Sequence, residues 1–335
     1  MQYKKFFIFI FCFSILYGGE YADSFLRTGV SARAIAMGNS IGALDRTETA
    51  FLKNPAGLAY QQNLRVGMMY TSQFGLADQN YLGLALPLWD NPRTSLTFSW
   101  VRFQVDDIIY RPDIVGEISD QNARRDSVIN FSNSPFKTFQ DREEAIYISL
   151  ARMMKPRISL SWKFADIQLR IPFGVNFKIL RKQLYQNKGD GIGMDFGTGL
   201  YVNGESLTGI YDFGDIYFGF SWRDFFGTTI YWNTKKQDNI SPSTVFSVSF
   251  EQPLKFYNSK INICWEYDSK YNALRYGAEY DLFRRLAFRA GLENSKPSLG
   301  LGLKFNFLNK FTHIDYSFRN HDLGAIHRIG GGFVW

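Results

Sequence analysis

The chain offers few residues with which to build a catalytic or metal site. Its three histidines are His313, His321 and His327, all near the C-terminus. Histidine is the commonest general acid–base and a frequent metal ligand. These three follow no ligand spacing, and we interpret His321 with Asp322 as part of a solvated turn. The sequence therefore predicts no metal site.

Two other signals of enzyme chemistry fail in their sequence context. The stretch GDGIGMDFG at 189–197 has glycines at alternate positions, but no helix is predicted after it, as a phosphate-binding loop requires. We interpret its glycines as small residues that face a lumen. The chain has no G-x-S-x-G elbow, and no Ser–His or Asp–His pairing supports a phospholipase or protease. We therefore expect neither enzymatic activity nor a cofactor.

Charged residues of both signs recur on one face of the segments in the last third of the chain. Opposite charges on neighbouring strands can pair across the sheet. This pattern indicates ion pairs inside a polar lumen. It does not resemble the arrangement of residues in a catalytic site. The predicted lumen-facing charges are Glu266, Arg275, Glu279, Arg289, Lys304, Asp315 and Arg319.

Strands with a period of two must position these charges. In INICWEYDSK, for example, Ile263 and Trp265 alternate with Cys264 and Glu266. Segments of about ten residues with this alternation are long enough for a tilted strand to cross a bilayer. Six such strands fill the last third. Earlier ones are predicted near 63–73, 78–89, 94–106, 144–154 (or to 163), 168–185, 190–202, 214–225 and 243–253. The total number of predicted strands is about fourteen, an even number as in bacterial barrels.

The predicted connections between these strands differ in length on the two sides of the membrane. An even strand number places both ends of the barrel in the periplasm, where turns are short. The long connections at about 107–142 and 226–242 then lie outside, and the short WDNPR turn lies inside. The inner connection at about 203–213 is longer than this rule prefers.

Composition narrows the class of protein. Aromatic residues make up 17% of 335 residues, the mean hydropathy is −0.20, and no run of eighteen apolar residues occurs, which excludes a helical membrane protein. The net charge of +7 is small and scattered, so nucleic acid is not an expected partner. A soluble two-sheet sandwich is the alternative. Its polar face would be rich in Lys and Glu, whereas here Gly, Ser, Asn and paired charges favour a membrane barrel.

Both ends of the chain carry signals. Residues 1–19 have two lysines followed by a short apolar stretch, which predicts a signal peptide. Cys12 lies in that stretch, so Cys264 would remain as a single thiol without a disulfide partner. At the other end, HRIGGGFVW places Gly331, Phe333 and Trp335 on one face. We interpret Trp335 as a member of an aromatic girdle at the membrane interface.

One segment does not have the strand pattern. Residues 29–59 are rich in Ala and Gly and end in an Asn-Pro-Ala-Gly motif. Thr47 or Thr49 could cap a short helix there, with Gly57 near its end. We expect residues 20–62 to form a hatch that plugs the lumen; the alternative is an arm on the periplasmic rim. Residues 63–335 would then form the barrel.

This segment resembles the N-terminal motif of the PorV/PorQ family of outer-membrane proteins, which are relatives of the fatty-acid transporter FadL. The family pattern G-x-x-A-R-A-x-x-M-G, followed by N-P-A-G-L, is matched by Gly29, Ala32, Arg33, Ala34, Met37, Gly38, Asn54, Pro55, Ala56, Gly57 and Leu58. The acidic patch between the two parts is thin, with only Asp45 and Glu48. The resemblance implies a fourteen-stranded barrel with an N-terminal hatch. It also likens Gly331, Phe333 and Trp335 to the terminal signal that the barrel-assembly machinery reads.

Two functions of different classes follow from the resemblance. A PorV-like protein would support type IX-like secretion and bind secreted cargo proteins. A FadL-like protein would pass hydrophobic small molecules across the membrane. A barrel without a transport role is a third reading. All place the chain in the outer membrane of a Gram-negative-type bacterium, in contact with lipid, and the sequence favours the first.

Overall fold

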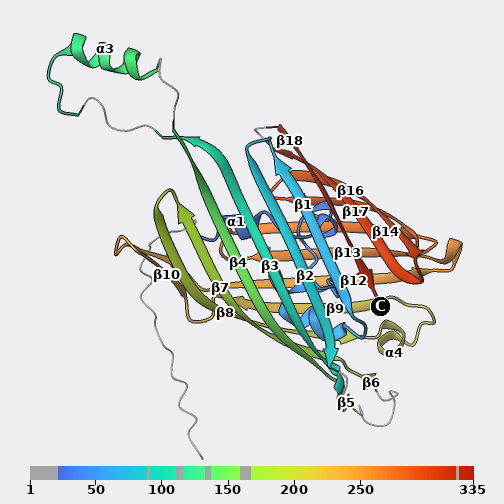
Figure 1. Ribbon diagram of the computed structural model, residues 1–335. Helices are drawn as coiled ribbons and strands as arrows, with labels where there is room; N and C mark the ends of the chain where they lie inside the picture. The colour runs from blue at the N-terminus through green and yellow to red at the C-terminus, as the bar shows by residue number, and fades with distance from the viewer. Residues whose placement is uncertain (1–21, 89–90, 111–115, 133–136, 159–166, 322–323) are drawn as a thin grey trace, which may run out of the picture.

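Antiparallel strands form a closed barrel in the computed structural model, which describes residues 22–88, 91–110, 116–132, 137–158, 167–321 and 324–335. Within these residues fourteen strands each pair with the next, and β1 pairs with β18, so that the ring of fourteen strands is closed (Figure 1). The predicted fold class is confirmed. The barrel strands are β1 (Arg65–Gln73), β2 (Ala77–Leu88), β3 (Asn91–Ile109), β4 (Thr138–Met154), β7 (Ile171–Leu184), β8 (Asn187–Val202), β9 (Asp215–Arg223), β12 (Ser243–Leu254), β13 (Ser259–Asp268), β14 (Ala273–Leu282), β15 (Leu286–Glu293), β16 (Lys296–Phe307), β17 (Lys310–His321) and β18 (Gly324–Val334).

The strands turn their apolar side chains outward and their polar side chains into the lumen. On β13, Ile263 and Trp265 are 55% and 37% exposed, whereas Asn262 and Glu266 are fully buried. A soluble sandwich would show the reverse, so that alternative is wrong. The closed ring also satisfies the backbone hydrogen bonds of its strands without water, as a bilayer requires.

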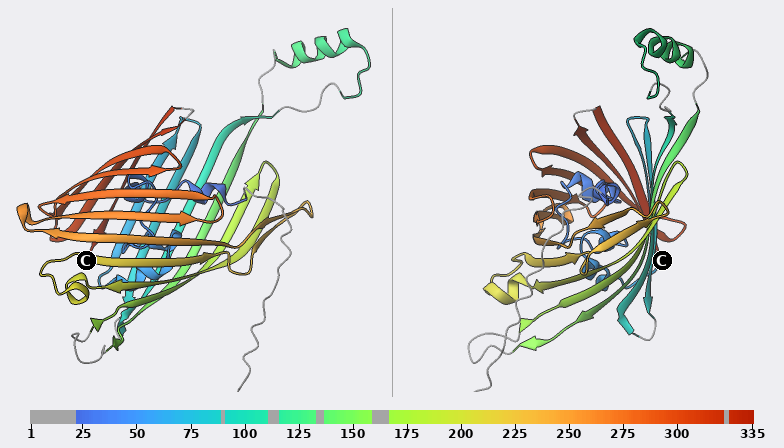
Figure 2. Two further views of the ribbon diagram at one scale, coloured as in Figure 1. Left: turned by 180° about the vertical axis from the view of Figure 1, so that it is seen from behind. Right: turned by 90° about the vertical axis from the view of Figure 1, so that its left-hand side faces the viewer.

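Additional short elements occupy the longer connections. They are the hairpins β5 (Arg157–Ile158) with β6 (Ile167–Gln168) and β10 (Thr228–Trp232) with β11 (Gln237–Ile240), the helices α3 (Gln121–Ser132) and α4 (Gly204–Thr208), and the 3₁₀ turn η3 (Phe256–Asn258). α3 belongs to the long connection after β3 and stands beyond the strand ends (Figure 2). β10 extends the wall above β9 by pairing with β8. β4 ends at Met154. The alternative in which this strand continues to residue 163 is therefore wrong within the described residues.

The N-terminal segment, residues 22–62, lies inside the barrel (Figure 2). It contains α1 (Ser24–Arg27), α2 (Ala32–Ala36) and the 3₁₀ helices η1 (Ala50–Leu52) and η2 (Pro55–Tyr60). Its first part contacts the outer turn between β13 and β14, where Lys270 pairs with Asp23 at 2.6 Å. Its last residues lead into β1 at the inner rim. The segment therefore runs through the lumen from the outer to the inner end.

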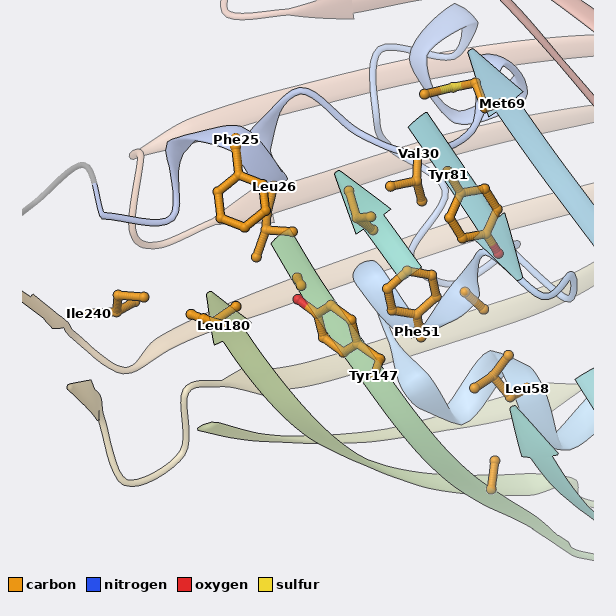
Figure 3. Close-up of a cluster of buried hydrophobic side chains, with 14 of the residues drawn as sticks. Phe25, Leu26, Val30, Phe51, Leu58, Met69, Tyr81, Tyr147, Leu180 and Ile240 are labelled. Atoms are coloured by element: carbon orange, nitrogen blue, oxygen red, sulfur yellow. The ribbon is translucent and has the colours of Figure 1, made fainter. Parts of the chain in front are cut away.

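Apolar side chains attach one side of this segment to the wall formed by β1 to β7 (Figure 3). Phe51 is the centre of the cluster. Its ring lies 4.6 Å from that of Tyr147 and 5.9 Å from that of Tyr81, measured between centroids. Burial of aromatic rings is among the larger apolar contributions to stability. The lumen thus contains a small hydrophobic core of its own.

The caps of the short helices differ from those expected. Thr49 stands at the N-cap position of η1, but its side chain makes no capping hydrogen bond. The hydroxyl groups of Thr47 and Thr49 donate hydrogen bonds to Asp45. Asn54 caps η2 instead: its Oδ1 accepts a hydrogen bond from the N–H of Ala56 at 3.0 Å. Asn54 itself is extended, as expected for a residue before proline. Gly57 lies within η2 and does not end it.

The expected signal peptide, including Cys12, lies outside the described residues. Cys264 is a buried free thiol. None of the helices in the described parts has the length and apolar character that crossing a membrane requires.

The C-terminal strand gives a first testable prediction. Val334 and Phe333 pair with Arg65 and Val66, and the N–H of Trp335 donates to the carbonyl of Leu64 at 2.9 Å. Deletion of residues 333–335 removes this part of the barrel closure, so we expect little folded protein in the membrane. Heat-modifiability on gels measures the folded fraction. Trp335→Phe keeps an aromatic ring at the interface and should assemble normally. Normal folded levels of the truncated chain would contradict the prediction.

Candidate functional site in the barrel lumen

The first part of the motif places α2 against the wall formed by β14 to β17. Ala32, Ala34 and Met37 are buried there. Arg33 extends toward β14, where its Nε and Nη2 donate to the two carboxylate oxygens of Glu279 at 2.9 and 2.8 Å. Burial disfavours the charge of Arg33, but Glu279 outweighs this effect and raises the pKa of the guanidinium. Such a bidentate pair is strong and directional.

Glycines allow the segment to touch the wall backbone to backbone. Gly38 has a φ of +62°, a conformation that favours glycine. It lies against Gly291 of β15, where an added Cβ would overlap the backbone of Met37 and Gly38. Gly29, at φ +83°, provides the turn before α2. The glycines of the motif are therefore explained by backbone geometry and close packing.

The second part of the motif lies against β7 and β8. The Nδ2 of Asn54 donates to the carbonyl of Thr198 at 3.0 Å. A Cβ at Gly174 or Gly197 would overlap Pro55 or Asn54. A Cβ at Gly57 would overlap the carbonyl oxygen of Asp45. This close approach, and not a positive φ, is what requires glycine at position 57.

Ion pairs line the opposite wall of the lumen. Arg275 is central to one group: its guanidinium contacts Glu266 at 2.8 Å, Asp268 at 3.0 Å and Glu293 at 2.8 Å. Lys53 of the N-terminal segment approaches the same Glu266 at 3.2 Å. Burial, together with the charge of Arg275, lowers the pKa of Lys53, and Glu266 offsets part of this effect.

A second group of ion pairs joins β14, β15 and β17. Arg289 contacts Glu279 at 2.6 Å and Asp315 at 2.7 Å. Since Glu279 also accepts both hydrogen bonds of Arg33, this group is continuous with α2. The remaining charges of the predicted set also have partners: Lys304 pairs with Asp281, and Arg319 pairs with Glu293 at 2.6 Å.

A third group was not singled out from the sequence. Lys178 of β7 lies 2.8 Å from both Asp195 of β8 and Asp224, the residue after β9. The backbone N–H of Asp224 also donates to Asp195 at 2.9 Å. The group is located where β8 changes its partner from β9 to β10. Asp195 belongs to the 189–197 stretch, whose glycines lie buried on the inner face of β8.

The histidines are separated from one another. His313 lies 3.8 Å from Asp315, His327 contacts the hydroxyl of Tyr316 at 2.6 Å, and His321 packs near Phe74. Among the described residues, no group of three or more His, Cys, Asp or Glu side chains could hold a metal ion.

A cavity of about 670 Å³ lies between the N-terminal segment and the inner half of the barrel wall. Pro253, Ser259 and Arg284, which lie at or beside the inner strand ends, are part of its lining, so it reaches the inner mouth. Its volume is within the range of small-molecule sites. Toward the outer end a separate cavity of about 30 Å³ lies beside Asp23 and Lys178. The N-terminal segment lines both cavities.

The contact at Gly291 can be tested directly. A Cβ there collides with backbone atoms, which cannot move as a flexible side chain can. Gly291→Val should therefore displace α2 from the wall and make the N-terminal segment accessible to protease in the intact membrane. Ala290→Val is the matched control, because Ala290 is the next residue of the same strand and points outward. Equal protection of both variants would contradict this account of the contact.

The distribution of apolar and charged residues on the barrel indicates where the protein is located in the cell. A closed sheet with apolar residues outside and charged residues inside fits a lipid environment. This protein is an outer-membrane β-barrel. Neither known family models nor curated proteins match the chain.

Three solved structures are similar to this chain, each with a TM-score below 0.5. The toluene transporter TbuX of Ralstonia pickettii has a TM-score of 0.40 and 11% identity, with 91% of this chain and 97% of that chain covered. A FadL homologue of Pseudomonas aeruginosa has a TM-score of 0.44 and 11% identity, with 91% and 96% covered. A mutant of the monoaromatic hydrocarbon channel TodX has a TM-score of 0.40 and 10% identity, with 91% and 97% covered. At TM-scores below 0.5 we base no argument on these likenesses.

Proposed function

We propose that this chain is a non-enzymatic, FadL-like transporter that passes small molecules across the outer membrane, with residues 22–62 as its hatch. The observation that supports this most is the cavity of about 670 Å³ between that segment and the wall. A purely structural barrel has no need of an internal space of this size. The PorV/PorQ-like motif supports the role of the segment, because its residues make the contacts with the wall described above.

The contacts of the hatch suit a part that moves. Much of its attachment consists of hydrogen bonds and ion pairs, such as those of Arg33 and Lys53. Water can replace these contacts when the segment shifts. The pairs of Arg275 and Arg289 within the wall would remain, so the barrel would keep its shape while the hatch moved.

A cross-link provides the test. Asp23 and Lys270 are in contact at the outer mouth, and the other end of the hatch is continuous with β1. Joining Asp23→Cys to Lys270→Cys with a short bismaleimide fixes both ends of the hatch. In proteoliposomes, solute-dependent swelling should then fall to the protein-free rate. Each single-cysteine variant treated with the same reagent is the control. Swelling that is unchanged by the cross-link, or absent in all samples, would overturn the proposal.

The second candidate is a PorV-like role in type IX-like secretion, in which the barrel binds secreted cargo. α3 favours it, because the helix stands at the outer side and exposes Val128 and Ile129. In this case deletion of residues 121–132 should abolish co-purification of secreted proteins, whereas the cross-linked hatch should leave it intact. Swelling that depends on the hatch, without co-purified cargo, would favour transport.

A further inference from the structure

The lining of the large cavity has a feature that a hydrophobic solute does not explain. Several of its charged side chains have buried polar atoms that, within the described residues, lack a hydrogen-bond partner. They carry both signs: the carboxylate oxygens are Glu48 Oε2 and Asp281 Oδ1, and the guanidinium nitrogens are Arg46 Nε, Arg46 Nη2 and Arg65 Nε.

Glu48 is one of the two buried carboxylates among these groups. It is 2% exposed and rests against Gly67 of β1, where any Cβ would overlap its carboxylate. The hydroxyl of Tyr81 holds its backbone by donating to the carbonyl oxygen at 3.2 Å. Its Oε2 has no hydrogen-bond partner among the described residues, and a buried polar atom without a partner is costly. Glu48 is therefore positioned to accept a donor that enters the cavity.

Arg46 presents a fixed cation to the same cavity. Its guanidinium lies 4.0 Å from the ring centroid of Tyr217 and 5.1 Å from that of Tyr60. The nearest carboxylate in ion-pair range, Glu251, is 4.0 Å away and makes a closer pair with Lys260 at 2.8 Å. Stacking thus holds the plane of Arg46 while leaving its N–H groups available to an anion.

We propose that this cavity binds a small zwitterionic solute, with an ammonium group at Glu48 and a carboxylate at Arg46 and Arg65. This inference rests on the proposed transport function and names its substrate class. A hydrocarbon would leave the charges of the lining desolvated and unpaired. A simple anion would be repelled by the carboxylates of Glu48 and Asp281. A simple cation would be repelled by the guanidinium groups of Arg46 and Arg65. Only a solute with both charges satisfies both sets of groups.

The ionisation of Glu48 adds a pH dependence. Burial raises the pKa of Glu48 to about 7, and Arg65 opposes that rise. An ammonium group favours the ionised carboxylate, so binding should strengthen as the pH rises from 6 to 8. The other charged groups that face Glu48 are Asp45 on its own segment and Asp315 on β17, and His313 lies beside Asp315. The pH profile must therefore be compared with that of a Glu48 variant.

Three ligands whose carbon chains have the same length provide the test. In calorimetric titrations of the detergent-purified full chain, 4-aminobutyrate should bind roughly tenfold tighter or more than butyrate or butylamine. Glu48→Gln should remove the advantage over butyrate and flatten the pH dependence. Arg46→Gln should remove the advantage over butylamine. Glu205→Gln, in the exposed α4, is the control and should change nothing.

The outcomes separate this site from the transport function. Equal affinity for the three ligands, or a wild-type preference that persists in Glu48→Gln, would overturn the zwitterion site even if swelling still depends on the hatch. Heat-modifiability verifies that each variant is folded. A clear preference without hatch-dependent swelling would support the site and overturn transport instead.

Discussion

Deletion of residues 20–62 should convert the protein into an open pore with large and weakly selective conductance in planar bilayers. The described part of this segment lies in the lumen, with a cavity of about 30 Å³ beside it toward the outer end (Figure 2). Its removal would join that space to the inner cavity of about 670 Å³. The exposed path would be lined by charges of both signs, including Arg275, Glu279 and Arg289, so neither cations nor anions should be strongly preferred.

The barrel itself should survive this deletion. Arg275 keeps its three carboxylate partners, and Arg289 keeps Glu279 and Asp315. A chain that lacks residues 121–132 is the matched control, because α3 lies outside the barrel and its removal should not change conductance (Figure 2). If the 20–62 deletion inserts in heat-modifiable form but conducts no more than wild type, the segment is no plug.

Replacement of Arg275 by methionine should destabilise the barrel by about 3 kcal/mol, because the change removes the cation that Glu266, Asp268 and Glu293 share. Each of these carboxylates keeps one other cation, which limits the loss; these cations are Lys53, Arg223 and Arg319. The three carboxylate residues are at most 3% exposed, so water cannot compensate. Urea titration of the heat-modifiable form measures the change. Arg275→Lys should show an intermediate loss, since an ammonium group keeps the charge but not the planar geometry.

A surface ion pair supplies the comparison for this experiment. Arg181 lies 3.8 Å from Asp190, and both side chains are mostly exposed. Arg181→Met should cost less than about 1 kcal/mol, as is usual for exposed pairs. Similar urea midpoints for Arg275→Met and wild type would show that the buried group does not hold the wall together.

The sequence predicted the barrel well because a membrane strand has a simple pattern. Lipid on one side and a polar lumen on the other impose a strict period of two, and each of the fourteen predicted segments overlaps an observed strand. The same alternation predicted that the charges from Glu266 to Arg319 share one face, and both of these residues make ion pairs. The loops contain no such pattern, and α3, α4 and the β10–β11 hairpin were therefore not predicted.

The site depended on contacts between distant parts of the chain. Sequence alone marked Arg33 and the N-P-A-G motif as unusual, but it could not show that Arg33 meets Glu279 or that Asn54, not Thr49, caps the helix. Lys53 carried no periodic signal, because it lies outside the strands, although it forms a buried ion pair. Lys178 lies on the inward face of β7, but the sequence did not show that Asp195 and Asp224 are its partners.

By itself, then, the sequence determined that strands alternate, that they are long enough to cross a membrane, and that their inner faces carry opposite charges. These are local properties, fixed by the side-chain period and the thickness of a bilayer. Only the tertiary structure decided that the N-terminal segment lies in the lumen, which carboxylates share each arginine, and that Glu48 and Arg46 line one cavity. Those relations join residues up to some 250 positions apart, such as Arg33 and Glu279, and they exist only because closure of the barrel brings its walls around the segment.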